Sequence, residues 1–163
     1  FPMTDQRDKF WDMIEDHHAC MLVTHGPGGT LHARPMHAIP DREKREILFY
    51  TQVADGKAHE IASSNEVCLT FVSHKKNDYI AVQGTAELTR DRELIEKHWN
   101  IMVKAWFPEG KDDPNIAMIR VKVRAGEYWD SSSSDISNAL RMMTAAAGGR
   151  RPDMGDNERV RFS

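Results

Sequence analysis

Several motifs that would assign a function at once are missing from the 163 residues. There is no Gly-x-Gly-x-x-Gly between a predicted strand and a helix, and no Gly-x-x-x-x-Gly-Lys-Ser/Thr. A Rossmann dinucleotide site and a triphosphate-binding P-loop are therefore not expected. The Gly-x-Ser-x-Gly turn of a serine nucleophile is also missing. Without any of these motifs, the sequence does not identify catalytic residues.

Long apolar runs and cysteines are scarce as well. No stretch approaches the roughly 20 apolar residues that span a bilayer. The first residues, Phe1–Thr4, lack a basic region followed by an apolar one, so no signal peptide is expected. Cys20 and Cys68 both lie in apolar runs, where small buried thiols are a more frequent outcome than a disulfide. The pattern favours a reducing compartment, so we expect a cytoplasmic protein without a membrane partner.

An excess of positive charge is absent too. Lysine and arginine number 22 against 25 aspartate and glutamate, a formal net charge of -3. Because affinity for nucleic-acid phosphates comes from surplus positive charge, general nucleic-acid binding is not expected. The eight histidines are scattered, with no His-Glu-x-x-His and no cysteine pair at zinc spacing. No metal site is predicted from them.

The sequence does contain a series of short apolar runs separated by turn signals, which is typical of an antiparallel sheet in one domain. Six strands are predicted, at residues 19–25, 30–39, 47–51, 66–73, 79–89 and 116–129. Six strands are enough to close a small barrel. Pro35 has no backbone donor, so the strand that contains it must lie at an edge or be locally distorted.

Three helices are predicted around these strands. The first lies near the start of the chain and has Phe10 and Ile14 on its buried face. The second is a short helix over residues 55–62, with Asp55 as its cap. The third covers residues 91–106, where apolar positions recur at helical spacing. One helix thus precedes the predicted strands, two fall between them, and all three flank the sheet.

The character of the chain changes after Trp129. We expect residues 1–130 to form the domain and residues 131–163 to be a C-terminal extension that is partly helical or flexible. Within it, residues 136–147 have a helical pattern, whereas residues 148–163 are charged and are expected to be mobile.

One local cluster has the chemistry of a phosphate site. Arg34 lies on a predicted strand, Thr51 ends the next strand, and Lys57 falls in the first turn of the short helix. A helix start offers free N–H groups, and an arginine fork suits phosphate oxygens. The same residues are also compatible with a solvated arginine and lysine beside a capping threonine. The pattern alone leaves both alternatives open.

Short motifs in a fixed order connect this chain to a known family. They are Met21–Thr24, Ala33–Met36, Leu48–Thr51, Asn65–Phe71, Trp106–Gly110 and Glu127–Trp129. With this order and spacing the chain resembles the FMN-binding split-barrel superfamily of pyridoxamine 5'-phosphate oxidase, most closely its general stress protein branch. The resemblance covers about residues 6 to 130. It implies a mainly β fold with flanking helices, a six-stranded antiparallel split β-barrel that forms a homodimer.

The resemblance also implies where FMN would lie, in a cleft between the two subunits. Arg34, Thr51 and Lys57 would bind its phosphate, and Trp106 and Trp129 would approach from the partner subunit. The cofactor-binding positions that the resemblance implies are Arg34, Pro35, Met36, Phe49, Tyr50, Thr51, Lys57, Gln83, Trp106 and Trp129. Residues 1–130 would then be an FMN-binding domain.

Three functions remain open on this evidence. The first is an FMN-dependent oxidoreductase that takes electrons from NADH or NADPH. The second is a flavin-binding stress protein with little turnover. The third is a split-barrel module that binds another ligand, such as haem through a histidine. The C-terminal Arg-x-His motif of true pyridoxamine 5'-phosphate oxidases is absent, so oxidation of vitamin B6 is the less favoured activity.

Overall fold

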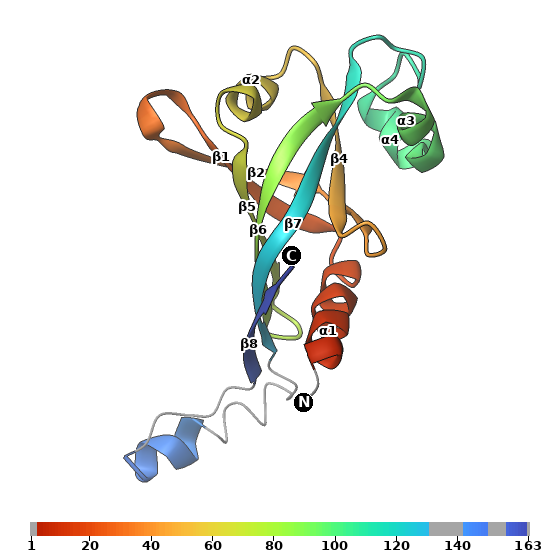
Figure 1. The fold of residues 1–163 in the computed structure, drawn as a ribbon. Helices are drawn as coiled ribbons and strands as arrows, with labels where there is room; N and C mark the ends of the chain where they lie inside the picture. Colours follow the sequence, from red (N-terminus) through yellow and green to blue (C-terminus); the bar gives the residue numbers. More distant parts are fainter. Residues whose placement is uncertain (1–2, 131–141, 150–155, 163) are drawn as a thin grey trace.

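A single curled antiparallel sheet with helices at its side and ends forms this protein (Figure 1). The computed structural model describes residues 3–130, 142–149 and 156–162. The strands are β1 (Ala19–His25), β2 (Leu31–His37), β3 (Ile39–Asp41), β4 (Glu46–Gln52), β5 (Glu66–Ser73), β6 (Asp78–Thr89), β7 (Ile116–Asp130) and β8 (Asp156–Arg161). The main α-helices are α1 (Met3–Glu15), α2 (Gly56–Ser63), α3 (Arg92–His98) and α4 (Ile101–Trp106).

The sheet order is β2-β1-β5-β6-β7-β4-β3, and β8 joins β7 beside β4. The long strand β7 therefore has β6 along one edge and two partners along the other. Its first half pairs with β4 and its second half with β8. At the opposite end of the order, β2 is an edge strand. This confirms the position predicted for Pro35, which cannot donate a backbone hydrogen bond.

All six predicted strands are present, but the predicted count of six is too low, because the sheet has eight strands within the described residues. The run at 30–39 divides into β2 and β3 at Ala38, whose N–H bonds to His18 O instead (2.9 Å). The other additional strand is β8, within the tail that we expected to be mobile. A mainly β, antiparallel fold is thus confirmed, with two strands that the pattern did not predict.

Strand β8 is ordered by packing as well as by pairing with β7. Val160 is buried, and Phe162 packs against the main core, with its ring 5.8 Å from that of Phe10. Arg7 and Arg45 lie over the Phe162 ring at 5.4 and 5.7 Å. The apolar side chains at alternate positions, between charged ones, are a strand pattern that the sequence does contain.

Of the helix predicted at 136–147, residues 142–147 are helical and the rest lies outside the described residues.

A β-bulge divides β7 at the point where its outer partner changes. Gln83 pairs with Ala125 but Gly84 pairs with Val123, so Arg124 has no partner on β6. The buried side of β7 consequently switches from odd-numbered residues, such as Val121 and Val123, to even-numbered ones. Gly84 is required here, because a Cβ at this position would lie 2.4 Å from Lys122 O.

The concave side of the sheet holds the main hydrophobic core. Helix α1 covers this side with Phe10 and Ile14, both fully buried as the helical spacing predicts. A second cluster joins α3 to β4 and β7 through Leu94, Ile95 and Leu48. The single helix predicted over 91–106 is in fact two helices.

The break between α3 and α4 has a local cause. The Asn100 side chain accepts hydrogen bonds from the N–H groups of Met102 and Val103 (2.9 and 3.1 Å) and so caps a new helix. No helix in the described part of the chain is long and apolar enough to cross a membrane. Both cysteines are free thiols, Cys20 buried and Cys68 half-buried.

Candidate functional site

Arg34 projects from the edge strand β2 into a network of polar groups on β1 and α2. Its guanidinium donates to Thr24 Oγ1 (2.7 Å) and to Glu60 Oε2 (2.8 Å). The side chain is 23% exposed, so it is held in place but still reached by solvent. The predicted phosphate-binding arginine is therefore oriented by an ion pair with α2.

Glu60 is the centre of this network, and no role was predicted for it from the sequence. Its carboxylate also accepts the Thr24 hydroxyl and lies 2.7 Å from His32 Nδ1. The hydrogen bond from Thr24 is the largest of the causes that lower the pKa of Glu60 from 4.5 to about 2. The bonds from His32 and the guanidinium add to this shift, and burial opposes it. Glu60 therefore carries a full negative charge at neutral pH.

Lys57 lies in the first turn of α2, as predicted, and Asp55 is the N-cap. The Asp55 carboxylate accepts from the Lys57 backbone N–H (3.3 Å) and also pairs with the Lys57 ammonium. Burial raises the pKa of Asp55, but the hydrogen bonds from Lys57 and the charge of Arg34 outweigh it and hold this pKa below its usual range. The field of Arg34 thus reaches the α2 N-terminus, so the two predicted cations belong to one cluster.

Thr51 stands out because its hydroxyl is buried without a partner. The residue is 2% exposed, and its Oγ1 makes no hydrogen bond within the described residues. It lies just before the turn that the Asp55 N–H closes on Gln52 O (3.1 Å), which leads into α2. Buried hydroxyls in native proteins nearly always have a partner, so this group is available to a ligand oxygen. His17, His98 and Arg120 also have a buried side-chain nitrogen without a hydrogen-bond partner among the described residues.

The cluster has the donors that a phosphate needs, although its charges are balanced without one. Arg34 and Lys57 provide two positive charges, and Glu60 and Asp55 provide two negative ones. A guanidinium has five N–H donors, so Arg34 can bind a further oxygen while it keeps Glu60. The ammonium of Lys57 is on a flexible stem and can turn from Asp55 to an incoming anion. Together with the unsatisfied Thr51 hydroxyl, these groups fit a phosphate monoester.

Of the other predicted positions on β2 and β4, several have packing roles in the structure. Pro35 is exposed on the edge strand, and Met36 packs partly against the main core. Phe49 is fully buried in that core. The Tyr50 hydroxyl donates to Ile95 O (2.6 Å) and its ring contacts those of Trp99 and Phe107. Any contact of Phe49 or Tyr50 with a ligand remains a prediction.

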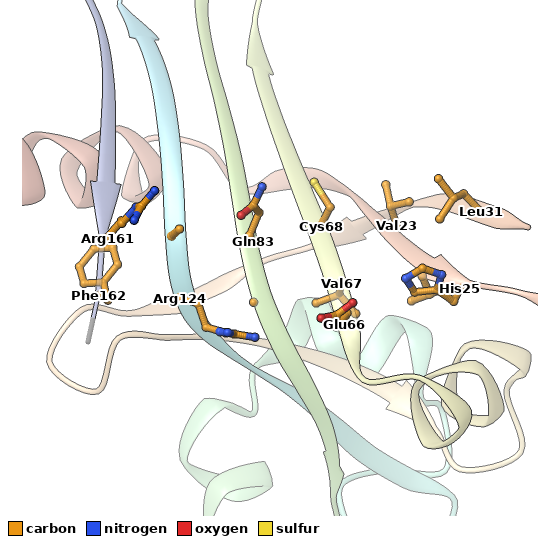
Figure 2. Close-up of a pocket in the computed structure, with 13 residues that line it drawn as sticks. Val23, His25, Leu31, Glu66, Val67, Cys68, Gln83, Arg124, Arg161 and Phe162 are labelled. Carbon is orange, nitrogen blue, oxygen red and sulfur yellow. The ribbon is translucent and has the colours of Figure 1, made fainter. Parts of the chain in front are cut away.

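The remaining three predicted positions lie on the surface. Gln83 is exposed and lines an open groove of about 590 Å³ on the outer face of the sheet (Figure 2). Trp129 is 37% exposed on the same face, and Trp106 is 79% exposed at the end of α4. Trp11 is buried and Trp99 packs in the second cluster, so both have packing roles. In the described part of the chain, no group of three or more His, Cys, Asp or Glu residues could hold a metal ion.

Fold and site together define the class of protein: a curled antiparallel sheet with a cluster of two cations and two carboxylates between its edge strand and its short second helix. A family model confirms the resemblance. The chain belongs to the pyridoxamine 5'-phosphate oxidase-like family, whose model matches residues 5–153.

Two curated relatives are similar to this chain. General stress protein 26 of Bacillus subtilis (strain 168) is 29% identical over 123 residues, which cover 72% of this chain and 84% of the relative. Protein bli-3 of Neurospora crassa is 32% identical over 97 residues. That match covers 55% of this chain and 46% of bli-3, so the similarity spans less than half of the fungal protein.

Solved structures have the same fold. A candidate general stress protein 26 from Jannaschia sp. CCS1 has a TM-score of 0.79 at 26% identity, and the match covers 98% of this chain and 99% of that one. The general stress FMN/FAD binding protein from Xanthomonas citri has a TM-score of 0.70 at 28% identity, covering 80% of this chain and 92% of that one. The predicted general stress protein branch is therefore confirmed.

Proposed function

We propose that this protein binds FMN and holds its phosphate between Arg34, Thr51 and Lys57. The observation that carries the proposal is the buried, unsatisfied hydroxyl of Thr51 at the end of β4, next to the turn into α2. In this proposal one phosphate oxygen accepts that hydroxyl, and the other oxygens accept from the two cations. The similarity to a protein named for FMN/FAD binding supports a flavin as the molecule that carries this phosphate.

In this proposal the carboxylates hold the site ready while no phosphate is bound. Glu60 keeps the Arg34 guanidinium extended along β1, and Asp55 keeps the Lys57 ammonium at the start of α2. A phosphate takes over part of these contacts, because arginine and lysine form charge-assisted hydrogen bonds with phosphate oxygens as they do with carboxylates. The flavin, when bound, supplies the redox chemistry. The chain's own residues bind its phosphate and orient it.

We further propose that two copies of the chain assemble through the outer face of the sheet, with the flavin between them. Val72, Tyr79 and Trp129 are neighbours in register across β5, β6 and β7, and they are 47%, 42% and 37% exposed. This outer apolar row, Val72–Tyr79–Trp129, faces away from the main core. Contiguous exposed apolar side chains are a feature of interaction surfaces. A second copy would bury the row and close a dry slot for the flavin ring.

A titration of the purified full chain with FMN tests the proposal. We expect the absorption bands of FMN to shift on binding, and the Thr51→Val variant, which keeps the shape but removes the hydroxyl, to bind FMN more weakly. Thr30→Val is a matched control, because Thr30 is an exposed threonine in the turn before β2. A chain that leaves the FMN spectrum unchanged, or a haem-type spectrum in the purified protein, would refute FMN binding.

The oxidoreductase role is the finer part of the proposal and needs a separate experiment. If the protein passes electrons from a reduced nicotinamide to an acceptor, NADH or NADPH must bleach the bound flavin in a stopped-flow experiment. If neither nucleotide bleaches it, the protein is a flavin-binding stress protein instead. Both outcomes leave the binding site itself in place.

A further inference from the structure

The Glu60 carboxylate divides its two oxygens between different partners. Oε1 lies 2.7 Å from His32 Nδ1, whereas Oε2 accepts from the Arg34 guanidinium (2.8 Å) and from the Thr24 hydroxyl. His32 and Arg34 are two residues apart on β2, so their side chains lie on the same face of the sheet. Thr24 is the register partner of His32 on β1. The sheet and α2 together fix the arrangement of these four side chains.

The contact with Glu60 determines which nitrogen of the His32 imidazole carries a proton. The hydrogen bond from Thr24 is the main cause that lowers the pKa of Glu60 to about 2, so this carboxylate is ionised at neutral pH and only accepts. His32 Nδ1 therefore donates, and Nε2 is the nitrogen that can gain a second proton. The ring packs against the main chain of Gly26, where a Cβ would lie 2.8 Å from the ring Cε1. The contact thus depends on a glycine at position 26.

His32 prevents Glu60 from binding Arg34 with both of its oxygens. Guanidinium and carboxylate groups frequently form bidentate pairs, in which two N–H donors meet two oxygens. Because His32 occupies Oε1, one N–H group of Arg34 donates to Glu60 and another donates to Thr24. The other N–H groups of the guanidinium are available to a ligand. Without His32, Oε1 would be free to take a further donor from Arg34.

We propose that His32 regulates the phosphate site, because it holds Glu60 and so sets how many Arg34 donors are available to a phosphate. This inference rests on the proposed function and concerns the regulation of the same site. Histidine is the side chain whose charge ordinarily changes between about pH 5 and pH 8. A cationic imidazole adds an ion pair to its hydrogen bond with Glu60 and competes with Arg34 for this carboxylate. The phosphate should therefore bind more tightly as the pH falls.

The charges around His32 give the same sign. The charged and titratable groups on the elements that surround it are Asp55, Lys57, His59 and Glu60 on α2 and its cap, His25 on β1 and Arg34 on β2. Of these, Glu60 is the hydrogen-bond partner of the imidazole within the described residues. His25 follows Thr24 and so faces the other side of the sheet, and His59 is exposed. The two cations and two carboxylates balance, so a proton on His32 makes the cluster net positive and attracts an anion.

Equilibrium dialysis of FMN with the full chain at about pH 8 and about pH 6 tests the proposal. His32→Asn keeps a side-chain N–H donor near the place of Nδ1 but cannot gain a charge, whereas His32→Phe has no donor. At the higher pH we expect His32→Phe to bind FMN about fivefold more weakly than the unmodified protein, and His32→Asn to bind it equally well. At the lower pH the unmodified protein should bind FMN about threefold more tightly than His32→Asn. The titration of the phosphate itself is common to both proteins and cancels in this comparison.

Three controls show whether His32 acts through Glu60 and on the phosphate. In a chain that carries Glu60→Ala, the further change His32→Phe should leave FMN binding unaltered. The affinity for riboflavin should change by less than about twofold in every variant. His74→Phe replaces an exposed histidine in the turn between β5 and β6 and should have no effect. Equal losses for FMN and riboflavin, the same loss with and without Glu60, an equal loss in His74→Phe, or equal FMN binding by His32→Asn and the unmodified protein at the lower pH would overturn the proposal.

Inorganic sulfate, which keeps both negative charges at either pH, separates this proposal from FMN binding. We expect sulfate to raise the Tm of the unmodified protein more than that of His32→Phe. If FMN does not bind but sulfate acts in this way, the proposed function is wrong, and the regulation of an anion site by His32 stands. If sulfate raises the Tm of both proteins equally, or of neither, the regulation by His32 is refuted, whether FMN binds or not.

Discussion

At the scale of single residues, the polar network around Glu60 has a defined dependence on pH. The pKa of this carboxyl is about 2 in the folded protein against an ordinary value of 4.5. A group with a depressed pKa in the folded state stabilises the fold above its ordinary pKa, and this stabilisation is lost as the pH falls towards the folded value. The contribution of Glu60 is therefore full at neutral pH and decreases from about pH 4.5 to about pH 2.

The variant Glu60→Gln should expose this dependence. At pH 7 we expect a lower free energy of unfolding than in the unmodified protein, because Arg34 loses its charged partner. The difference between the two proteins should shrink as the pH is lowered below 4.5. Urea unfolding at a series of pH values measures it. A difference that stays constant from pH 7 down to pH 3 would contradict the role assigned to the charge.

At the scale of elements, strand β8 is the part of the fold that depends most on contacts distant in sequence. Its partner β7 ends at Asp130, and its apolar side chains pack against α1 at the start of the chain. The ring of Phe162 lies among Phe10, Trp11 and two arginines. The C-terminal strand is thus joined to β7 by backbone pairing and to α1 through one aromatic side chain.

Truncation of that side chain should loosen the strand. For Phe162→Ala we expect a loss of about 2 kcal/mol in the free energy of unfolding, less than the roughly 3–5 kcal/mol of a fully buried phenylalanine, because Phe162 is only half-buried. Arg159→Gln on the same strand should change stability by less than about 0.5 kcal/mol. Hydrogen exchange of the β8 amides, measured with the unfolding curve, would show the local effect. Equal protection of β8 in Phe162→Ala and in the unmodified protein would mean that pairing alone orders the strand.

Much of the sheet could be predicted from the sequence, because it depends on local patterns. Alternation and turn residues predicted six strands, and the missing donor of Pro35 predicted an edge. The second helix and its Asp55 cap were also predicted, since capping is a local interaction. The prediction of a single helix over residues 91–106 failed because two local structures compete there. Asn100 interrupts a good helical pattern because its side chain caps a new helix.

The candidate site could be predicted only in part. Arg34, Thr51 and Lys57 were named from their residue types and from the resemblance, but the carboxylate of Glu60 was not. Its role depends on α2 lying against β1 and β2, which no local pattern predicts. The residue types in the sequence predict which side chains can donate hydrogen bonds to a phosphate. The tertiary fold decides which groups of the protein they bond to.

At the scale of the whole molecule, the proposed dimer makes a prediction about the outer apolar row. We expect the chain to be a dimer at micromolar concentration and the variant Val72→Asp/Tyr79→Asp to be a monomer, because two buried carboxylates would disfavour the interface. Light scattering measures the mass. Ile101→Asp is the matched control, since Ile101 is 81% exposed on α4 and lies outside that face. A monomeric unmodified chain, or a control that dissociates equally, would refute this interface.

The central claim concerns the phosphate of FMN, and riboflavin, which lacks that phosphate, provides the direct comparison. Each charge-assisted contact is worth about 1.5–3 kcal/mol, so Arg34→Ala/Lys57→Ala should weaken FMN binding by at least about a hundredfold. The affinity for riboflavin should change by less than about threefold.

Arg90→Ala/Lys111→Ala removes the same two charge types from exposed positions and is the control. The most direct measurement is therefore the ratio of the FMN and riboflavin dissociation constants in these proteins. We predict that this ratio rises in the Arg34/Lys57 variant alone, and equal losses for the two ligands would contradict the phosphate site.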